Sequence, residues 1–522
     1  MAPANSINGV LEQIYDAIVI GSGVGGGVVA RRLSENGIRV LILERGSFVP
    51  RGPENWSVQA VFSERRYKAR ETWLDRRGQP FDPGIHYNVG GSTKFFGAAM
   101  FRLRERDFEE LEHKDGLSPA WPYRYADLAP YYDEAEAMFG VRGDGTLDLT
   151  SPQGGRPYPY PAVPSELLVE ALAARLRGLG LSPTPLPLAV NAGHGGGCIL
   201  CGTCDGFPCQ IGQKGDAEIC AIEPALATGR ADLLTRALAR RLILSPDGRR
   251  VEAVEVEHAG EVKRFSAPLV VVSCGAINSA ALLLRSADTP APRGVANNSG
   301  VVGRHYMVHN ATAVMALSHR RNPTVFQKTV VLNDYYFGDD AFPWPMGQMQ
   351  MLGKLQGGII VSKVPYLPRF VGDAVASRSL DLVGISEDLP DPENRVTLES
   401  GQIRLSVTPN NLEGHRKLIE RMKQSLRRSG FPIIVSRSLM GGGTAHQCGT
   451  IRMGRDAATS ALDPFCRTWD HPNLFVVDAS FFPSSAAVNP ALTIAAQALR
   501  AADHMLATDF QVTRTSREIS GS

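Results

Sequence analysis

Short apolar runs separated by a glycine-rich turn organise the first fifty residues of the chain. The run 17–20 (AIVI) has the length of a buried strand, apolar residues then recur at helical spacing from 28 to 33, and 40–43 (VLIL) forms a second run. Runs that are apolar throughout are typical of parallel strands covered by helices on both faces. We therefore predict a strand, a helix and a second strand over residues 15–46.

Residues 242–273 show a different pattern, because apolar and polar positions alternate around two turn signals, Asp247-Gly248 and Ala259-Gly260. Alternation of period two with short turns is typical of antiparallel hairpins, so we predict a β-meander here. Residues 394–400 and 403–407 are further strand-like segments. Two stretches rich in Pro and Gly are predicted to be loops, 150–165 and 181–197.

The longest apolar run covers residues 267–284 and is interrupted by Gly275, Asn278 and Ser279. This pattern predicts a strand, a turn and the start of a helix, and no transmembrane segment. The N-terminal residues lack the basic region of a signal peptide, so we expect a cytoplasmic protein.

Length and charge narrow the class of protein. A chain of 522 residues exceeds the size at which one hydrophobic core normally stops growing, which predicts two closely packed domains. The 55 basic and 53 acidic residues nearly cancel, giving a net charge of +2. This balance argues against nucleic acid or an anionic membrane as the main partner and favours a small-molecule substrate.

Gly21, Gly23 and Gly26 form the pattern G-x-G-x-x-G between the first predicted strand and its helix. In this context the first glycine permits the tight turn, the second lets the backbone approach a pyrophosphate, and the third lets the helix pack on the strand. The helix N-terminus offers unpaired N–H groups to phosphate. Glu44 ends the second strand eighteen residues after Gly26, where a carboxylate binds an adenosine ribose and repels an NADP phosphate. These residues predict FAD or NAD binding.

Residues 86–108 (HYNVGGSTKFFGAAMFRLRERDF) favour FAD. Together with the glycine motif and segments 271–286, 301–310, 394–400 and 473–485, they resemble the glucose–methanol–choline family of FAD-dependent oxidoreductases. The resemblance follows the family's order from about residue 14 to 505. It implies an α/β (α+β) fold, with a Rossmann-like FAD-binding domain and a discontinuous antiparallel-sheet substrate domain.

Both implied domains are discontinuous, because the chain passes between them several times. The FAD-binding domain would comprise residues 14–110, 215–300 and 440–508, and the substrate domain residues 111–214 and 301–439. The substrate domain would include a cysteine-rich loop at 198–220, and residues 509–522 would form a polar tail.

The resemblance also implies which residues contact FAD. Gly21, Gly23 and Gly26 would hold the pyrophosphate and Glu44 the adenosine ribose. The other implied contacts are Arg45 beside Glu44, Gly90, Gly91, Ser92 and Thr93 on the ribityl-phosphate side, Ala239 near the adenine, Asp478 and Ala479 at the pyrophosphate and ribityl chain, and Asn489, Pro490 and Thr493 at the pyrimidine edge of the flavin.

Three positions depart from the family pattern. Phe96 stands where many members carry an Asn that contacts the flavin, and Ser286-Ala287-Asp288 replaces the usual end of the second signature. Lys94 stands where some sugar oxidases carry the His that attaches FAD covalently. We therefore expect non-covalent FAD.

The catalytic residues implied by the resemblance are His446, as the base, and Asn489, as its partner. Oxidation of an alcohol removes a hydroxyl proton while hydride leaves the carbon, and a base with a pKa near neutrality is suited to this step. Unperturbed histidine, at a pKa of ~6.5, needs no tuning. Asn489 can donate its amide to the substrate oxygen but cannot relay a proton. His86, His305 and His309 are expected to have structural roles only.

The segment 198–220 contains five of the eight cysteines. Its C-x2-C-x2-C spacing is also the start of a bacterial ferredoxin run, so Cys198, Cys201, Cys204 and Cys209 are candidate ligands of an iron–sulfur cluster. A cysteine-rich structural loop is the alternative. Zinc is disfavoured because the run lacks two separated ligand pairs, and disulfides are disfavoured in a cytoplasmic protein.

We therefore expect an enzyme that oxidises a CH–OH group of an alcohol or sugar to the carbonyl, with hydride passing to flavin N5 and the proton to His446. Oxygen, a quinone or a partner protein would reoxidise the flavin. The alternatives are a flavin-containing lyase of the same fold, or an FAD/iron–sulfur electron-transfer dehydrogenase subunit. The pattern does not choose between oxidase and dehydrogenase, and it does not identify the alcohol.

Overall fold

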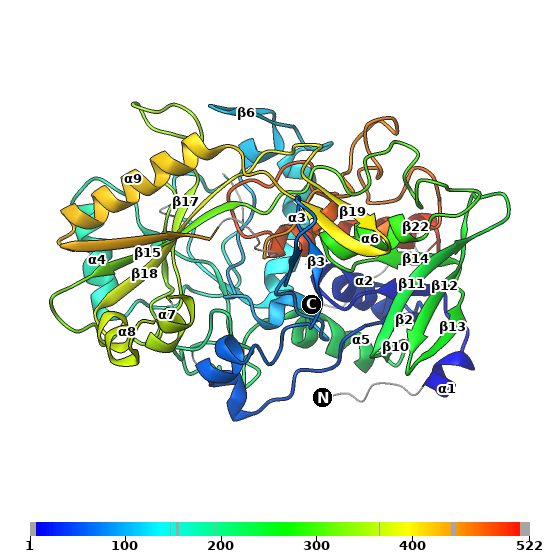
Figure 1. Ribbon diagram of the computed structural model, residues 1–522, viewed down its shortest axis with the longest axis horizontal. Coiled ribbons are helices and arrows are strands. Elements are labelled where there is room, and N and C mark those ends of the chain that lie inside the picture. The colour runs from blue at the N-terminus through cyan, green and yellow to red at the C-terminus, as the bar shows by residue number, and fades with distance from the viewer. Residues whose placement is uncertain are drawn as a thin grey trace, which may run out of the picture.

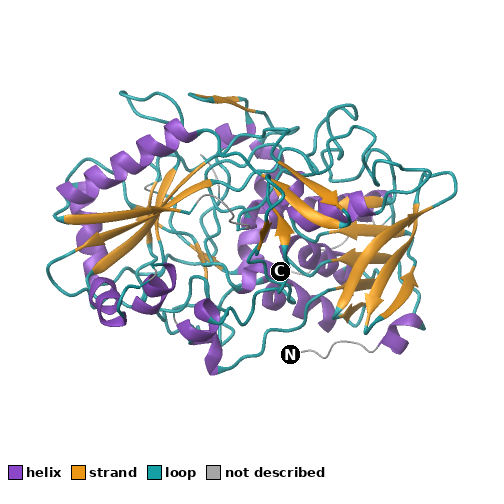
Figure 2. Cartoon of the chain, viewed as in Figure 1, coloured by secondary structure: helices purple, strands orange, loops and turns teal. Residues whose placement is uncertain are grey.

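The computed structural model describes residues 7–146, 148–152, 156–193, 195–364, 366–439 and 445–511. Two groups of strands lie at opposite ends of an elongated molecule (Figure 1). Loops predominate between the two groups (Figure 2). The predicted polar tail lies outside the described residues from 512 onward.

The first group contains a five-stranded parallel sheet in the order β10-β2-β1-β14-β22. Its strands are β1 (Ala17–Ile20), β2 (Val40–Leu43), β10 (Ala231–Leu234), β14 (Leu269–Val272) and β22 (Leu474–Val476). Helix α2 (Val24–Glu35) connects β1 to β2, so the predicted strand, helix and strand are confirmed. Every residue of β1, β2 and β14 is buried, which explains why these runs are apolar throughout.

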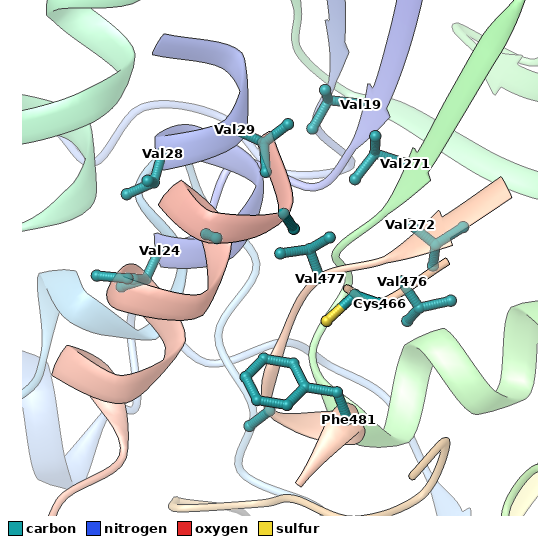
Figure 3. Packing of buried hydrophobic residues seen from close by; sticks show 14 of the residues in the cluster. Val19, Val24, Val28, Val29, Val271, Val272, Cys466, Val476, Val477 and Phe481 are labelled. Atoms are coloured by element: carbon teal, nitrogen blue, oxygen red, sulfur yellow. The ribbon is translucent and has the colours of Figure 1, made fainter. Parts of the chain in front are cut away.

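The core of this sheet is formed by small β-branched side chains from distant parts of the chain. In Figure 3, Val28 and Val29 of α2 lie next to helix α10 (Ala491–Thr508), and Val271 and Val477 lie at the ends of β14 and β22. These four valines have no exposed surface. The end of the chain therefore packs against the helix that follows the first strand.

A three-stranded antiparallel sheet, in the order β11-β12-β13, lies beside the parallel sheet (Figure 1). It comprises β11 (Ala237–Leu244), β12 (Val251–His258) and β13 (Glu261–Phe265), which confirms the predicted meander. Helix α6 (Ala276–Arg285) follows β14, so the apolar run 267–284 is a strand, a turn and a helix, as predicted. In the described part of the chain, no helix is long and apolar enough to span a membrane.

The second group is an antiparallel sheet of six strands in the order β21-β15-β18-β17-β16-β8. Helices α4 (Leu167–Arg177) and α9 (Leu412–Arg428) share its apolar cluster, and α7 (Gly357–Lys363) and α8 (Arg369–Ala376) lie nearby (Figure 1). The strands are β8 (Thr184–Pro185), β15 (Asn310–Leu317), β16 (Val330–Leu332), β17 (Gln348–Met351), β18 (Ser379–Ser386) and β21 (Ile433–Ser438). The α/β (α+β) fold class is confirmed, whereas the exact domain boundaries stay a prediction.

The remaining elements are short except for α3. Strands β19 (Arg395–Glu399) and β20 (Gln402–Ser406) correspond to the predicted segments 394–400 and 403–407. The predicted loop 181–197 contains two strands of two residues each, β8 and β9 (Leu188–Ala189). The remaining elements are α1 (Ile7–Leu11), α3 (Tyr125–Phe139), α5 (Glu223–Ala227), β3 (Trp73–Leu74), β4 (Pro80–Phe81), β5 (Leu111–His113), β6 (Gly116–Ser118), β7 (Val141–Arg142), the 3₁₀ turns Pro53–Trp56, Gly91–Lys94, Glu105–Phe108 and Ala479–Phe481, and the wider π-helical turns Gln59–Ser63 and Glu218–Ile222.

Candidate active site

Two glycine segments meet at the N-terminus of α2. Gly23 precedes the helix in an extended conformation and no side chain caps it, so the first N–H groups of α2 point away from the helix without a side-chain acceptor. A Cβ added at Gly23 would meet only Gly91 Cα, at 4.0 Å, among the described atoms. Gly21 and Gly91 both have positive φ, +103° and +56°, which glycine adopts without strain. The residues present therefore form a cradle that fits a pyrophosphate.

Gly25 and Gly26 are needed for packing. A Cβ on Gly26 would lie 2.1 Å from Gly21 O, as expected for close contact between helix and strand. A Cβ on Gly25 would lie 1.7 Å from Val477 O, so Gly25 lets the end of β22 reach the helix. The sequence motif did not include Gly25, and its only signal was the run of three glycines at 25–27.

Glu44 ends β2 beside the glycine turn. Its Oε2 accepts hydrogen bonds from the backbone N–H of Ser22 (3.1 Å) and the Ser22 hydroxyl (2.6 Å), and its Oε1 accepts one from Gly46 N (2.7 Å). Burial raises the pKa of this carboxyl. Ala237 N donates to Glu44 O at 2.9 Å, which attaches strand β11, with Ala239 on it, to the same place. The residues predicted to contact the adenosine, Glu44 and Ala239, are therefore brought to the same place in the fold.

The side chain of Arg45 is engaged with protein groups. Its guanidinium lies over the Tyr87 ring, 3.5 Å from the centroid, and pairs with Glu71. The Tyr87 hydroxyl donates to Glu71 as well, at 2.6 Å. Arg45 thus stands next to Glu44 as part of a structural cluster.

Asp478 connects three segments at the end of β22. Its Oδ2 accepts hydrogen bonds from Gly275 N (3.0 Å) and the Ser279 hydroxyl (2.5 Å), both at the start of α6. Ala479 O accepts a hydrogen bond from Gly449 N at 3.0 Å. These contacts place the segment that carries His446 beside β22.

Two residues predicted to contact FAD, Thr93 and Thr493, use their hydroxyls for hydrogen bonds within the protein. Thr93 Oγ1 donates to Gly90 O at 2.6 Å and accepts from Ala217 N at 3.0 Å. The Thr493 hydroxyl bonds to the Tyr132 hydroxyl at 2.8 Å. Both side chains are buried. Any contact of these residues with FAD would therefore be made by the backbone, whereas the side chain of Ser92 is exposed.

Lys94 is buried in an ion pair. Its Nζ lies 2.9 Å from Asp216 Oδ2 and 2.7 Å from Glu218 Oε2. These carboxylates raise its pKa against the opposing effect of burial, which is the largest single influence. Lysine at this position therefore stabilises the fold and is unavailable as a flavin attachment point.

His446 lies between Asn489 and His309. Asn489 Nδ2 is 3.3 Å from His446 Nε2, and His309 Nδ1 is 3.0 Å from His446 Nδ1. The structure thus brings the two predicted catalytic residues together, with Asn489 just before Pro490, the residue that caps α10. The expectation that His309 is only structural stays a prediction, and the structure adds that its ring bonds directly to the candidate base.

Backbone pairing explains this contact. Met307 and Cys448 form an isolated antiparallel bridge, with Met307 N donating to Cys448 O at 3.0 Å and Cys448 N to Met307 O at 2.9 Å. Two residues further along each segment, the antiparallel register places His309 opposite His446. No local sequence signal predicts the pairing of segments that lie 137 residues apart.

The hydrogen bonds define the tautomers of both rings. His309 Nε2 lies 3.0 Å from Ser485 O, which can only accept, so this nitrogen carries the proton. His309 Nδ1 is then an acceptor in the neutral ring, and His446 Nδ1 must donate to it. The Nε2 lone pair of His446 is consequently directed away from His309, toward Asn489.

The environment of His446 lowers its basicity. Loss of hydration, and next the neighbouring His309 and Lys328, lower the pKa of His446 to about 3. The expectation that this histidine needs no tuning is therefore wrong. At neutral pH the ring is uncharged and able to accept a proton, but holding the positive charge at this position is unfavourable.

One atom of the Asn489 amide, the oxygen Oδ1, is free for a ligand. Its Nδ2 donates to His446 Nε2, whereas its buried Oδ1 has no hydrogen-bond partner among the described residues. Turning the amide over would set Oδ1 against the lone pair of His446, so the orientation is determined. A buried acceptor without a partner indicates that a bound molecule donates a hydrogen bond here.

The cysteine-rich loop is folded around a buried ammonium group. Lys214 Nζ donates to the backbone oxygens of Phe96, Cys204 and Phe207, each at 2.8 Å. In the described ranges, no group of three or more His, Cys, Asp or Glu side chains is placed to hold a metal ion. The structure therefore supports the structural-loop interpretation and gives no support to an iron–sulfur cluster.

This loop also brings a charged pair near His446. Asp205 Oδ2 lies 2.9 Å from Lys328 Nζ and accepts a hydrogen bond from Gly353 N at 3.0 Å. Lys328 lowers the pKa of His446 and Asp205 opposes it, so both charges act on the base. Sequence reasoning missed this pair because its members come from separate segments.

The loop before Asn489 is held by a buried acid. Ala487 N donates to the Tyr336 hydroxyl at 3.1 Å, and that hydroxyl donates to Asp107 Oδ2 at 2.9 Å. Burial raises the pKa of Asp107 from 3.8 to about 7. Because the folded pKa is the higher one, this group contributes stability that is complete below 3.8 and is lost as the pH rises to 7.

We expect Asp107→Asn to remove this pH dependence. Relative to the unmodified protein, its free energy of unfolding should increase by ~1.4 kcal/mol per pH unit between about pH 4 and pH 7, and then level off. Urea unfolding across this range measures the difference. The matched control is Asp340→Asn, which removes a carboxyl at an exposed position. A constant difference for Asp107→Asn would contradict the assignment.

Comparison with known proteins decides the family. The sequence pattern of the GMC oxidoreductase family matches residues 85–311 in its N-terminal part and 390–498 in its C-terminal part. The chain belongs to the GMC oxidoreductase family. This confirms the resemblance to the glucose–methanol–choline enzymes, and as a GMC oxidoreductase the protein is an FAD flavoenzyme that acts on CH–OH donors.

Relatives of this GMC oxidoreductase include two oxidases from Streptomyces. The chain is 35% identical to 6'''-hydroxyparomomycin C oxidase of Streptomyces lividus, covering 94% of this chain and 91% of the relative. It is 34% identical to paromamine 6'-oxidase of Streptomyces fradiae, with the same coverage. Pyridoxine 4-oxidase from Mesorbium loti has a similar structure, with a TM-score of 0.66 at 22% identity over 94% of this chain and 99% of that one.

Proposed function

We propose that this GMC oxidoreductase oxidises a CH–OH group of an alcohol or sugar to the carbonyl, with His446 as the base. The observation that carries the proposal is the neutral imidazole whose Nε2 lone pair faces Asn489. When bound, FAD supplies the hydride acceptor at its N5 atom. The cradle at Gly23 and Gly91 and the first turn of α2 would hold its pyrophosphate.

His446, His309 and Asn489 together bind the hydroxyl group and remove its proton. His446 Nε2 accepts the hydroxyl proton, and its Nδ1–H bond to His309 keeps the ring in the required tautomer. Asn489 Oδ1 is free to accept a hydrogen bond from the substrate or the cofactor. As the proton leaves the hydroxyl, Asn489 Nδ2 can move its hydrogen bond from His446 to the substrate oxygen.

We further propose that the substrate carries several polar groups, as a sugar or an amino sugar does. Lys328 and Asp205 present a cation and an anion on the side of His446, and Lys328 is only 3% exposed. Charged groups at such a place match hydroxyl and amino substituents better than an alkyl chain. The names of the two Streptomyces relatives support this class.

Anaerobic reduction of the bound flavin tests the proposal. The purified yellow protein is mixed, without oxygen, with sugars, amino sugars and aliphatic alcohols, and the visible absorbance of the flavin is followed. We expect one polar alcohol to bleach it rapidly and to yield one carbonyl per flavin. The methyl ether of the same alcohol, which lacks the hydroxyl proton, is the matched control and should leave the absorbance unchanged.

Two other outcomes would support the rival functions. Cleavage of a substrate with unchanged flavin absorbance would show a lyase. Reduction by a partner protein alone, with no alcohol effective, would show an electron-transfer subunit.

A further inference from the structure

A second histidine and a buried carboxylate lie behind the candidate base. The N–H groups of Val308 and His309 donate to Asp388, at 2.7 Å to Oδ2 and 2.9 Å to Oδ1. The Ser485 hydroxyl donates to the same Oδ1 at 3.1 Å, while Ser485 O accepts from His309 Nε2. His309 and Asp388 are 4% and 6% exposed. The set therefore forms one buried network that ends at His446.

We propose that His309 is a proton-relay residue, which takes the substrate's proton from His446 and keeps it beside Asp388 during oxidation. This inference rests on the proposed function. His309 does not touch the reacting carbon, so it acts on the reaction only through His446.

One proton moves in each of two linked hydrogen bonds. The substrate O–H breaks and a new N–H forms at His446 Nε2, while the hydride leaves the carbinol carbon with its electron pair for FAD, the oxidant of the proposed function. The Nδ1–H bond of His446 breaks and a new N–H forms at His309 Nδ1. His446 ends as the neutral Nε2–H tautomer and His309 as an imidazolium with two N–H donors, one bonded to Ser485 O.

The two sites differ in how they stabilise the charge. Near His446 the cation Lys328 opposes a positive ring, and the carboxylate that favours one, Asp205, is already paired with that lysine. Near His309 the backbone N–H groups of Val308 and His309 hold the Asp388 carboxylate, which attracts a positive ring. Burial is the largest influence on the pKa of Asp388 and raises it, and His309 opposes that rise. The charges placed around the two rings therefore favour movement of a positive charge from His446 toward His309.

His309→Asn separates relaying from positioning. Asparagine tolerates the left-handed backbone of residue 309, where φ is +67°, and its Oδ1 can accept the Nδ1–H of His446, but it cannot take up a proton. We expect KM to change less than about threefold and the rate of anaerobic flavin reduction to fall by ~10- to 100-fold, less than for loss of the base itself. The matched control is His305→Asn, since His305 has φ +60° in the same segment, and its rate should be unchanged.

Chemical rescue gives the second measurement. His309→Gly also suits the left-handed backbone and leaves space for a five-membered ring. Added imidazole should restore the reduction rate at least about fivefold, whereas 1,2,4-triazole, which has the same shape but is a much weaker base, should not. Flavin absorbance and melting temperature report whether each variant retains its fold and its cofactor.

The outcomes distinguish this inference from the function on which it rests. A full rate in His309→Asn, or equal rescue by imidazole and triazole, would show that His309 only orients His446 and would overturn the relay. If His446→Ala also keeps its full rate, the proposed function itself fails.

Discussion

Replacing His446 with alanine is expected to lower the rate of flavin reduction at least ~100-fold, the range for losing a general base. The ring supplies the nitrogen lone pair that faces Asn489, and its hydrogen bond with His309 holds it there. The amide of Asn489 cannot replace it because an amide does not accept a proton at neutral pH. Substrate binding should weaken much less than turnover.

Single-turnover reduction under anaerobic conditions measures this step directly. The cradle at Gly23 and Gly91 does not include His446, so the variant should remain yellow with an unchanged flavin content. His504→Gln is the matched control, since His504 stacks on Phe465 in another part of the fold, with ring centroids 4.1 Å apart. A His446→Ala protein that retains more than about a tenth of the rate would contradict the assignment of the base.

The second large effect is expected at the glycines at the start of α2, where two substitutions should lower FAD binding for different reasons. Gly25→Ala places its Cβ 1.7 Å from Val477 O, so helix and strand must move apart at a cost of ~3 kcal/mol, and FAD binding should be lost as well. Gly23→Ala meets only Gly91 Cα at 4.0 Å and should fold normally. Its methyl group would occupy the space in front of the helix, so its FAD affinity should fall at least ~10-fold, or ~1.4 kcal/mol.

Thermal unfolding of the FAD-free proteins and titration with FAD separate the two effects. Gly27→Ala is the control within the same helix, because its Cβ would lie 3.1 Å from the Ala221 Cβ and 3.3 Å from the Ile222 side chain, so a shift of a few tenths of an ångström relieves the contact. Its stability and FAD affinity should stay close to those of the unmodified protein. Full FAD affinity in Gly23→Ala would show that the cofactor does not approach the helix at this residue.

The sequence by itself determined the local elements of this protein and its family. Apolar runs of four residues predicted β1 and β2, because a parallel strand is buried on both faces and excludes polar side chains. The alternating pattern of 242–273 predicted the meander for the converse reason, since one face of that sheet is solvated. The glycine motif and Glu44 predicted a dinucleotide cofactor, and the family resemblance carried by residues 86–108 and the later segments favoured FAD.

Only the tertiary structure decided what surrounds the base. His309 and His446 face each other because Met307 pairs with Cys448, and Asp205 reaches Lys328 because Lys214 folds the cysteine-rich loop. The same packing removes water from His446 and lowers its pKa to about 3. These contacts join segments far apart in the chain, and their energies depend on distance and hydration, which periodicity and spacing along a sequence do not encode.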